Sequence, residues 1–192
     1  MLAWHVDYWD YLGWKDPFAA PAYTARQKRY RATRELKFFG TPMLFVNNTH
    51  TRGRDAVKTA VAREAKKKAR LRIHATAKKK PEGAIEATIK LEKLDAKLEF
   101  PKSVAVIPIL FQRAVKTRCT AGENKGKTLD EYFVVRQLLE PRAASLAARK
   151  GVEVRFRAPK GVETANLGVA VLVEDRVSMT VLDCLAVPVA ER

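Results

Sequence analysis

The stretch RLRIHATAKKKPEGAIEATIKLE, residues 70–92, alternates apolar and polar side chains on both sides of the turn Pro81-Glu82-Gly83. A period of two is typical of half-buried strands, because successive side chains of a strand point to opposite faces. The stretch therefore predicts an antiparallel hairpin. In that hairpin the basic polar face of the first strand lies opposite Glu86 and Glu92, and cross-strand ion pairs use part of the positive charge.

The same alternation continues toward the carboxyl terminus. Its phase slips by one residue near Leu94, which predicts a bulge or a new strand. Residues 70–192 are therefore predicted to form an antiparallel, sandwich-like β domain. Further strands are expected at residues 104–111, 115–120, 131–139, 152–158, 167–173 and 177–187.

Residues 1–69 predict a different order of elements. A short strand is expected over residues 2–6, and a helix over residues 22–36, where side chains recur at helical spacing. Residues 41–48 predict a strand that ends in an Asn-Asn turn, because Asn tolerates a positive φ. A second short strand near residues 50–53 completes this hairpin.

A second helix is expected over residues 56–68. Asp55 is placed to cap its amino end, and Val57, Val61 and Ala65 are expected to form its buried stripe. The order strand, helix, strand, strand, helix indicates a partial α/β domain. The fold class predicted for the whole chain is α+β, with a boundary near residue 69.

Composition limits the kind of protein this is. The 192 residues contain 37 Lys plus Arg and 21 Asp plus Glu, a net charge of +16, with 47% hydrophobic residues. The hydrophobic content argues that the chain folds and is not disordered throughout. No apolar run approaches the ~20 residues of a membrane-spanning helix. The start of the chain also lacks the basic and apolar pattern of a secretory signal.

The positive charge is concentrated in one segment. Residues 63–80 hold nine basic groups and one acid, which is half of the net charge. A charge this positive raises nucleic acid as a partner. No stretch, however, resembles a recognition helix, a zinc finger or an aromatic stacking platform. A solvated basic surface is the favoured interpretation, and weak attraction to polyanions remains an alternative.

The three histidines are candidate metal ligands. In an extended segment His5 and Asp7 share one face, and with His50 or His74 they would imitate a site of two His and one carboxylate. His74 falls on the solvent face of its predicted strand, and His50 lies in a hairpin turn. A hydrogen-bonded pair of His5 and Asp7 is therefore favoured, and neither a metal nor another cofactor is expected.

Nucleophilic chemistry has little support in the sequence. Cys119 and Cys184 are 65 positions apart, so two separate buried thiols are favoured over a disulfide. Neither belongs to a Cys-x-x-Cys motif, and no serine lies in a nucleophile elbow. The segment 122–127 only loosely resembles a phosphate loop, and a turn between strands is favoured. The candidate residues of this turn are Gly122, Glu123, Asn124 and Gly126.

The run LAWHVDYWDYLGWKDPF, residues 2–18, resembles the hallmark of a family of mostly exported bacterial proteins catalogued as domain of unknown function 1223. The run is long and rich in tryptophan, which makes the resemblance specific. It covers most of the chain in order. The similarity continues at Gln27, Tyr30, Thr41-Pro42-Met43, Val46-Asn47, Gly53–Val57, Ala121–Leu129 and Val134-Val135-Arg136.

The resemblance implies a thioredoxin-like fold with a β-rich carboxyl-terminal part, in which Pro42 is commonly cis. Family members usually carry a strand and a Cys-x-x-Cys-Pro-Pro segment before the tryptophan-rich run, and this chain starts after it. A start placed too late, or a degraded reading frame, would explain the difference. An in-frame segment upstream would indicate an extracytoplasmic thiol-disulfide redox protein.

Without that dithiol, thiol catalysis is not expected. The sequence then favours a non-catalytic binding or structural module, with a protein or peptide as partner. The resemblance implies that Pro42 shapes a groove and that the tryptophan-rich run lines it or fixes the loop beside it, although core packing is equally favoured for the tryptophans. The candidate groove or loop residues are Asp7, Trp9, Asp10, Trp14, Thr41 and Pro42.

Overall fold

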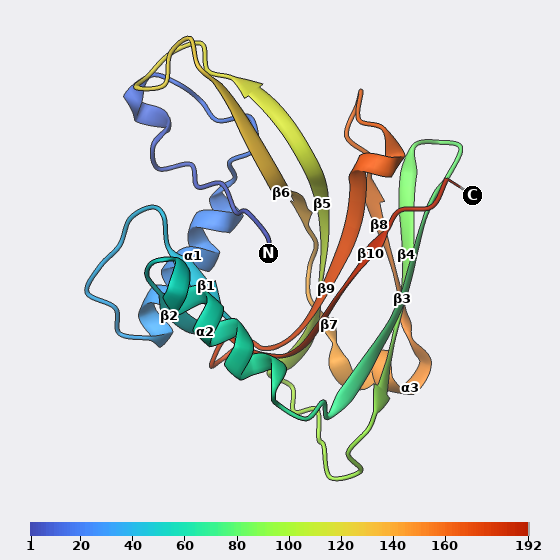
Figure 1. Ribbon diagram of the computed structural model, residues 1–192. Coiled ribbons are helices and arrows are strands. Elements are labelled where there is room, and N and C mark those ends of the chain that lie inside the picture. Colours follow the sequence, from blue (N-terminus) through green and yellow to red (C-terminus); the bar gives the residue numbers. More distant parts are fainter. Residues whose placement is uncertain (192) are drawn as a thin grey trace.

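The computed structural model describes residues 1–191, and within them the chain forms three α-helices and ten strands in three antiparallel sheets (Figure 1). Two larger sheets make up the carboxyl-terminal part. One contains β3 (Leu71–Lys79), β4 (Ala84–Lys93) and β8 (Val152–Arg157). The other has the order β10-β9-β5-β6, with β7 also paired to β5. Its strands are β5 (Val104–Arg118), β6 (Thr128–Leu138), β7 (Arg142–Ala143), β9 (Leu167–Asp175) and β10 (Thr180–Pro188).

The hairpin predicted from residues 70–92 is confirmed. β3 and β4 pair antiparallel, so that Arg72 lies opposite Glu92. Glu92 contacts both Arg72 (3.4 Å) and His74 (2.8 Å), and Glu86 contacts Lys80 (2.9 Å). The acidic side chains of β4 therefore neutralise part of the basic segment. His74 is exposed, as its place on the solvent face predicted.

The two larger sheets face each other and enclose the main core (Figure 1). Val106 and Leu110 of β5 are fully buried in it, together with Ile85 and Ile89 of β4 and Phe156 of β8. Along one edge the sheets are joined through Ala190, whose backbone N–H donates to Ala77 and whose carbonyl accepts from Lys79, both at 2.9 Å. The predicted α+β class and the antiparallel pairing of this part are confirmed.

The five-stranded sheet is also covered on its other face. α1 (Pro21–Thr33) and the first residues of the chain lie there, and Tyr23, Leu2 and Trp4 pack against β5 (Figure 1). Because both faces of β5 are covered, Val104 to Phe111 are all buried. The usual alternation of buried and exposed positions is lost in this part of the strand.

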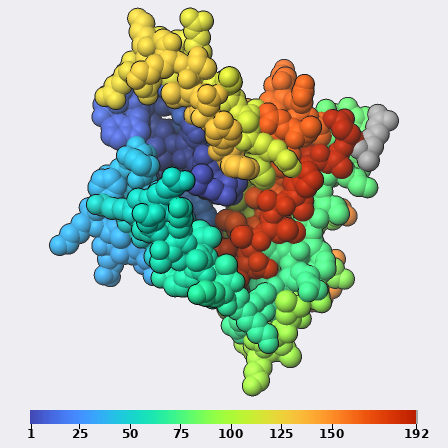
Figure 2. All heavy atoms as spheres, in the orientation of Figure 1, coloured from blue at the N-terminus to red at the C-terminus, as the bar shows by residue number. Residues whose placement is uncertain are grey.

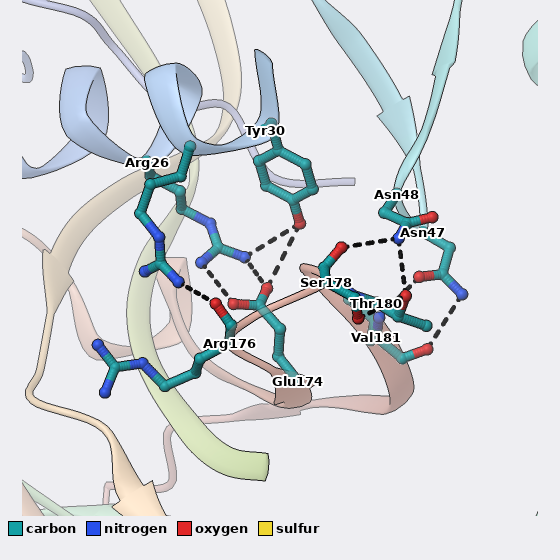
Figure 3. Close-up of polar contacts among 10 residues, drawn as sticks. Arg26, Tyr30, Asn47, Asn48, Glu174, Arg176, Ser178, Thr180 and Val181 are labelled. Atoms are coloured by element: carbon teal, nitrogen blue, oxygen red, sulfur yellow. Dashed lines mark hydrogen bonds and ion pairs between the residues drawn. The ribbon is translucent and has the colours of Figure 1, made fainter. Parts of the chain in front are cut away.

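The hairpin predicted before residue 56 is confirmed. β1 (Leu44–Val46) and β2 (Thr49–Thr51) form a two-stranded sheet. Asn47 lies in its turn with φ of 55°. Asn47 also pairs with the backbone of Val181, accepting from its N–H (2.7 Å) and donating to its carbonyl (3.0 Å). The turn therefore docks on the start of β10, and Figure 3 shows Asn48 beside it, where it bonds to Ser178 and Thr180.

The predicted strand over residues 2–6 is wrong. Only Ala3 forms a β-bridge, parallel to Val134, through 2.9 Å hydrogen bonds with Phe133 and Val135. Phe133 has a φ of 54°, which interrupts the extended conformation of β6. β6 still pairs with β5 on both sides of Phe133, whereas residues 2–6 form no further bridge with β6.

The second helix differs from its prediction. α2 (Arg54–Ala65) is capped by Gly53, and Asp55 lies in its first turn without a side-chain capping bond. The expected buried stripe is wrong: Ala60 is buried, whereas Val61 is 52% exposed and Ala65 is exposed. The small β1–β2 hairpin covers too little of the helix to bury a longer stripe.

Two other strand predictions are corrected. The phase slip near Leu94 is neither a bulge nor a new strand, because Asp95 starts a turn in which its side chain accepts from the N–H of Lys97 (2.9 Å). The strands expected at residues 104–111 and 115–120 are one strand, β5, with a register shift between Leu110 and Phe111. A short helix, α3 (Ala144–Lys150), was not predicted, because seven residues are too few to display a helical period.

Among residues 1–191, no helix has both the length and the apolarity needed to cross a lipid bilayer.

A buried ion pair joins α1 to β9 (Figure 3). The Arg26 guanidinium donates to both carboxylate oxygens of Glu174, one of them at 3.1 Å, and Glu174 is fully buried. Tyr30 lies against both groups, with its hydroxyl 3.2 Å from Arg26 and 3.4 Å from Glu174. Arg26 also lies over the ring of Trp4, at 5.1 Å. The pair therefore holds the helix and the amino-terminal segment against the sheet.

The substitution Arg26→Met should destabilise the fold by about 3–5 kcal/mol, because it leaves the buried carboxylate of Glu174 without a counter-charge. The double variant R26M/E174L should recover most of that loss. The free energy of unfolding in urea measures both. The exposed pair of Arg72 and Glu92 provides a control, since R72M should cause no measurable change. If R26M and the double variant lost the same free energy of unfolding, the unpaired carboxylate of Glu174 would not be the cause of the loss.

Candidate functional site

The tryptophan-rich run folds into a loop that two aspartates hold in place. Asp7 accepts a hydrogen bond from the Thr24 hydroxyl of α1 (2.5 Å), and its own N–H donates to that hydroxyl (3.2 Å). Asp10 begins the short 3-10 turn η1 (Asp10–Leu12) and accepts from the N–H of Asp16 (3.4 Å). Both carboxylates therefore fix the loop through its own chain and α1.

Trp9 lies against the Thr41-Pro42 segment. Its indole N–H donates to the Thr41 hydroxyl (3.0 Å), and the Thr41–Pro42 peptide bond is cis, as the family resemblance implied. Trp9 is 42% and Tyr11 76% exposed, and Thr41 and Pro42 are exposed as well. These four residues are called the Trp9 surface from here on.

Aromatic residues support the Trp9 surface from beneath. The ring of Tyr8 lies 5.2 Å from the rings of both Trp9 and Phe39. The chain next to Phe39 is held by α1, because the Gln27 side chain donates to the Gly40 carbonyl (2.8 Å). The exposed rings therefore pack on neighbouring side chains that restrict their motion. This restriction lowers the conformational entropy that the rings would lose on binding.

The structure brings the tryptophan-rich run and the segment 122–127 together. A Cβ on Gly122 would lie 3.3 Å from Cβ of Trp14 and 3.4 Å from the Leu12 carbonyl. Figure 2 shows the blue amino-terminal segment between the yellow tip of the β5–β6 hairpin above and the cyan segment around residue 50 below. Trp14 is therefore fixed by the hairpin and is not part of the exposed Trp9 surface.

The segment 122–127 is a turn between β5 and β6, as predicted. The Gly126 N–H donates to the Cys119 carbonyl (2.8 Å), and the Cys119 N–H donates to Lys127 (2.9 Å). The Lys127 ammonium donates to the side chain of Asn124 (3.2 Å). Glu123 is exposed on this turn. This hydrogen-bond pattern is that of the turn of a β-hairpin.

His5 does not pair with Asp7, which corrects the expected His/Asp pair. Its Nδ1 lies 2.6 Å from Asp16, and its Nε2 lies 3.7 Å from Glu131 of β6. The ring of Phe18 meets the His5 ring edge to face at 5.6 Å. Asp16 and Glu131 were not recognised in the sequence, because no spacing links a loop aspartate to a strand residue more than a hundred positions away.

The electrostatics of this cluster favour a charged imidazole. Burial by itself lowers the pKa of His5, but the hydrogen bond to Asp16 and the charges of Asp16 and Glu131 outweigh it and raise the pKa. Burial raises the pKa of Asp16, but its bonds to His5 and to backbone N–H groups outweigh this and lower it. Both shifts favour the charged forms, so the ion pair is stable at pH values between the pKa of Asp16 and the pKa of His5.

The other two histidines lie apart from His5. His74 bonds to Glu92 on the outer face of the three-stranded sheet. His50 belongs to the β1–β2 hairpin, with its ring 5.4 Å from that of Phe45. Within the described part of the chain, no three His, Cys, Asp or Glu side chains gather in an arrangement that could hold a metal ion.

Both cysteines are free, which confirms two separate thiols over a disulfide, but the predicted burial of both residues is correct for Cys119 and wrong for Cys184. Cys119 is fully buried at the end of β5. Cys184 lies on β10 and is exposed as a residue, yet burial of its thiol raises the pKa, as does the nearby charge of Asp183. A raised pKa keeps a thiol protonated, and the thiolate is the reactive form.

Comparison with protein families gives one decisive match. The model described as "Protein of unknown function (DUF1223)" matches residues 1–174. The chain belongs to the DUF1223 family. No curated protein matches this DUF1223 chain.

Solved structures resemble this DUF1223 protein along most of its length. Protein AGR_C_4864 from Agrobacterium tumefaciens matches with a TM-score of 0.63 and 20% identity, covering 97% of this chain and 79% of that one. HBP35 of Porphyromonas gingivalis matches with a TM-score of 0.65 and 16% identity, covering 89% and 60%. A domain of the outer membrane lipoprotein Omp28 from the same species reaches a TM-score of 0.42 at 19% identity, covering 65% and 91%. The first two likenesses show a shared fold.

The packing of the hairpin turn on the loop can be tested in this DUF1223 protein with two alanine substitutions. Gly122 and Gly126 have φ of 69° and 83°, so alanine at either should cost about 1–2 kcal/mol of strain. A Cβ at Gly126 meets nothing within 4 Å, whereas one at Gly122 meets Trp14. G122A should therefore lower the free energy of unfolding more than G126A. Equal losses would show that the contact with Trp14 contributes nothing.

The His5 cluster predicts a pH-dependent stability. Because the folded pKa of His5 is raised above 6.5, its contribution is complete below about pH 6.5 and is lost as the pH rises through the folded pKa. Asp16 contributes above its unfolded pKa of about 4, and its contribution is lost as the pH falls through its lowered pKa. The free energy of unfolding, measured in urea, should be lower near pH 8 than near pH 6. His5→Gln should make this decrease smaller. H74Q serves as control and should retain the wild-type decrease, and an unchanged decrease in H5Q would contradict the assignment.

Proposed function

We propose that this protein is a non-catalytic binding module whose Trp9 surface binds an extended polypeptide. The observation that carries the proposal is the exposure of two adjacent aromatic rings, Trp9 and Tyr11, whose centroids are 6.3 Å apart, beside an exposed Thr41-Pro42 segment. Exposed aromatic rings on a rigid support are typical anchors of protein and peptide interfaces.

We further propose that residues 1–69 form a partial thioredoxin-like domain and residues 70–192 a β domain. The succession of α1, β1, β2 and α2 supports this division, as does the position of Pro42 just before β1. In such a domain, Pro42 lies where a bound chain would pass. Because the family resemblance is to mostly exported bacterial proteins, an extracytoplasmic location is part of the same proposal.

A binding role agrees with the chemistry around the site better than catalysis does. Cys119 is fully buried, and the raised pKa of Cys184 disfavours its thiolate. Each nitrogen of the His5 ring faces a carboxylate, Asp16 or Glu131, so neither is directed at a substrate. The imidazole is therefore best described as part of the support for the loop.

The double variant W9A/Y11A should weaken binding of a carboxymethylated, permanently unfolded polypeptide by about tenfold or more, because truncating an aromatic anchor costs about 1 kcal/mol or more. Trp9→Phe should bind nearly as well as the wild type, since it removes the bond to Thr41 but keeps an exposed ring. Titration with a fluorescently labelled form of the polypeptide gives the affinities.

Leu94→Ala is the matched control, because Leu94 is 44% exposed on the loop after β4, away from the Trp9 surface. This variant should bind as the wild type does. Undiminished binding by W9A/Y11A, or an equal decrease in L94A, would contradict the proposed surface.

A further inference from the structure

Positive charge gathers where α1 meets the turn between β9 and β10. Arg29 and Arg34 come from α1 and its carboxyl-terminal cap, and Arg176 comes from the turn. All three side chains are exposed. Within residues 1–191 none of the three forms an ion pair with a carboxylate.

Backbone carbonyls position two of these arginines. Arg29 donates to the carbonyl of Arg176, and Arg34 donates to the carbonyl of Ser178 (3.2 Å). A neutral carbonyl orients a guanidinium without cancelling its charge. Because a guanidinium has five N–H donors, each side chain retains most of them for an outside anion.

The acidic groups near the turn are few, and one of them is paired with a cation. Glu174 is buried against Arg26, and Figure 3 shows the Arg176 side chain extending away from that pair. Asp175 accepts from the N–H of Val177 (2.9 Å), and this bond is the main cause of its lowered pKa. Between residues 21 and 37 there is one further acid, Glu35, against six basic residues. Basic side chains around the turn therefore outnumber acidic ones, and Asp175 remains a charged carboxylate among them.

The tip of the same turn is apolar. Val177 follows Arg176 directly and is 73% exposed. An exposed aliphatic side chain among arginines suits the boundary between lipid headgroups and acyl chains, where the aliphatic group is buried and the cations stay with the phosphates. The phosphates of a nucleic acid would also bind the arginines. The aliphatic side chain of Val177 would add no affinity for it, since bases are bound by aromatic stacking or by polar contacts.

We propose that Arg29, Arg34, Arg176 and Val177 form a docking surface for an anionic lipid bilayer. This surface is separate from the Trp9 surface and does not depend on the polypeptide-binding function. Its recognition chemistry is attraction of three guanidinium groups to lipid phosphates, together with shallow burial of Val177. A protein docked in this way lies on the membrane without crossing it.

Co-sedimentation of the full chain with vesicles tests the proposal. Binding to vesicles of phosphatidylcholine and phosphatidylglycerol should exceed binding to phosphatidylcholine alone, and should fall as salt shortens the Debye length. The variant R29Q/R34Q/R176Q should lose about a hundredfold in affinity, from about fivefold per charge. Val177→Ser should weaken vesicle binding several-fold while leaving retention on heparin unchanged.

A second variant separates the surface from the overall charge. K78Q/K79Q/K80Q removes three positive charges from the end of β3 and the turn that follows it, at the opposite end of the molecule from the turn between β9 and β10 (Figure 1), and should keep wild-type vesicle binding. Equal losses in the two triple variants, or no preference for anionic vesicles, would overturn the proposal. Tighter binding to a duplex oligonucleotide than to vesicles, with V177S indistinguishable from the wild type, would overturn it in favour of nucleic acid.

Discussion

The buried pair of Arg26 and Glu174 determines how the two parts of the chain meet. Charges removed from water are stable only when they are paired and hydrogen-bonded, so α1 has to lie where Arg26 reaches β9. This position sets Trp4 and Tyr23 on the second face of the five-stranded sheet. The same helix supplies Thr24, which fixes the loop that carries Trp9.

Because α1 lies on the five-stranded sheet, β5 is buried on both faces. One face of the strand forms the core with the three-stranded sheet, and the other is covered by α1 and the first residues of the chain. The two proposed binding surfaces lie at the margins of this core. The Trp9 surface lies on a loop attached to α1, and the arginines lie around the turn that follows β9.

Prediction from the sequence was accurate where periodicity or turn chemistry is local. The hairpin of β3 and β4, the Asn47 turn and the turn at 122–127 were all predicted, because each depends on side chains within a few residues of one another. The strand expected at residues 2–6, the capping by Asp55 and the stripe through Val61 were wrong. The strand and the stripe depend on what a distant segment covers, and no local pattern contains that information, whereas the helix simply begins two residues earlier, with Gly53 at the cap.

The sequence by itself determined the family, the α+β class, the alternating strands and the excess of positive charge, because motifs and periodicity are properties of neighbouring residues. Tertiary structure alone decided that His5 meets Asp16 and Glu131, that Trp14 packs on Gly122, and that Arg29 and Arg34 gather at Arg176. Except for His5 with Asp16, these contacts join residues that lie far apart in the chain. They depend on the packing of α1 and the amino-terminal segment against the sheet, to which the buried pair of Arg26 and Glu174 and the covered faces of β5 contribute.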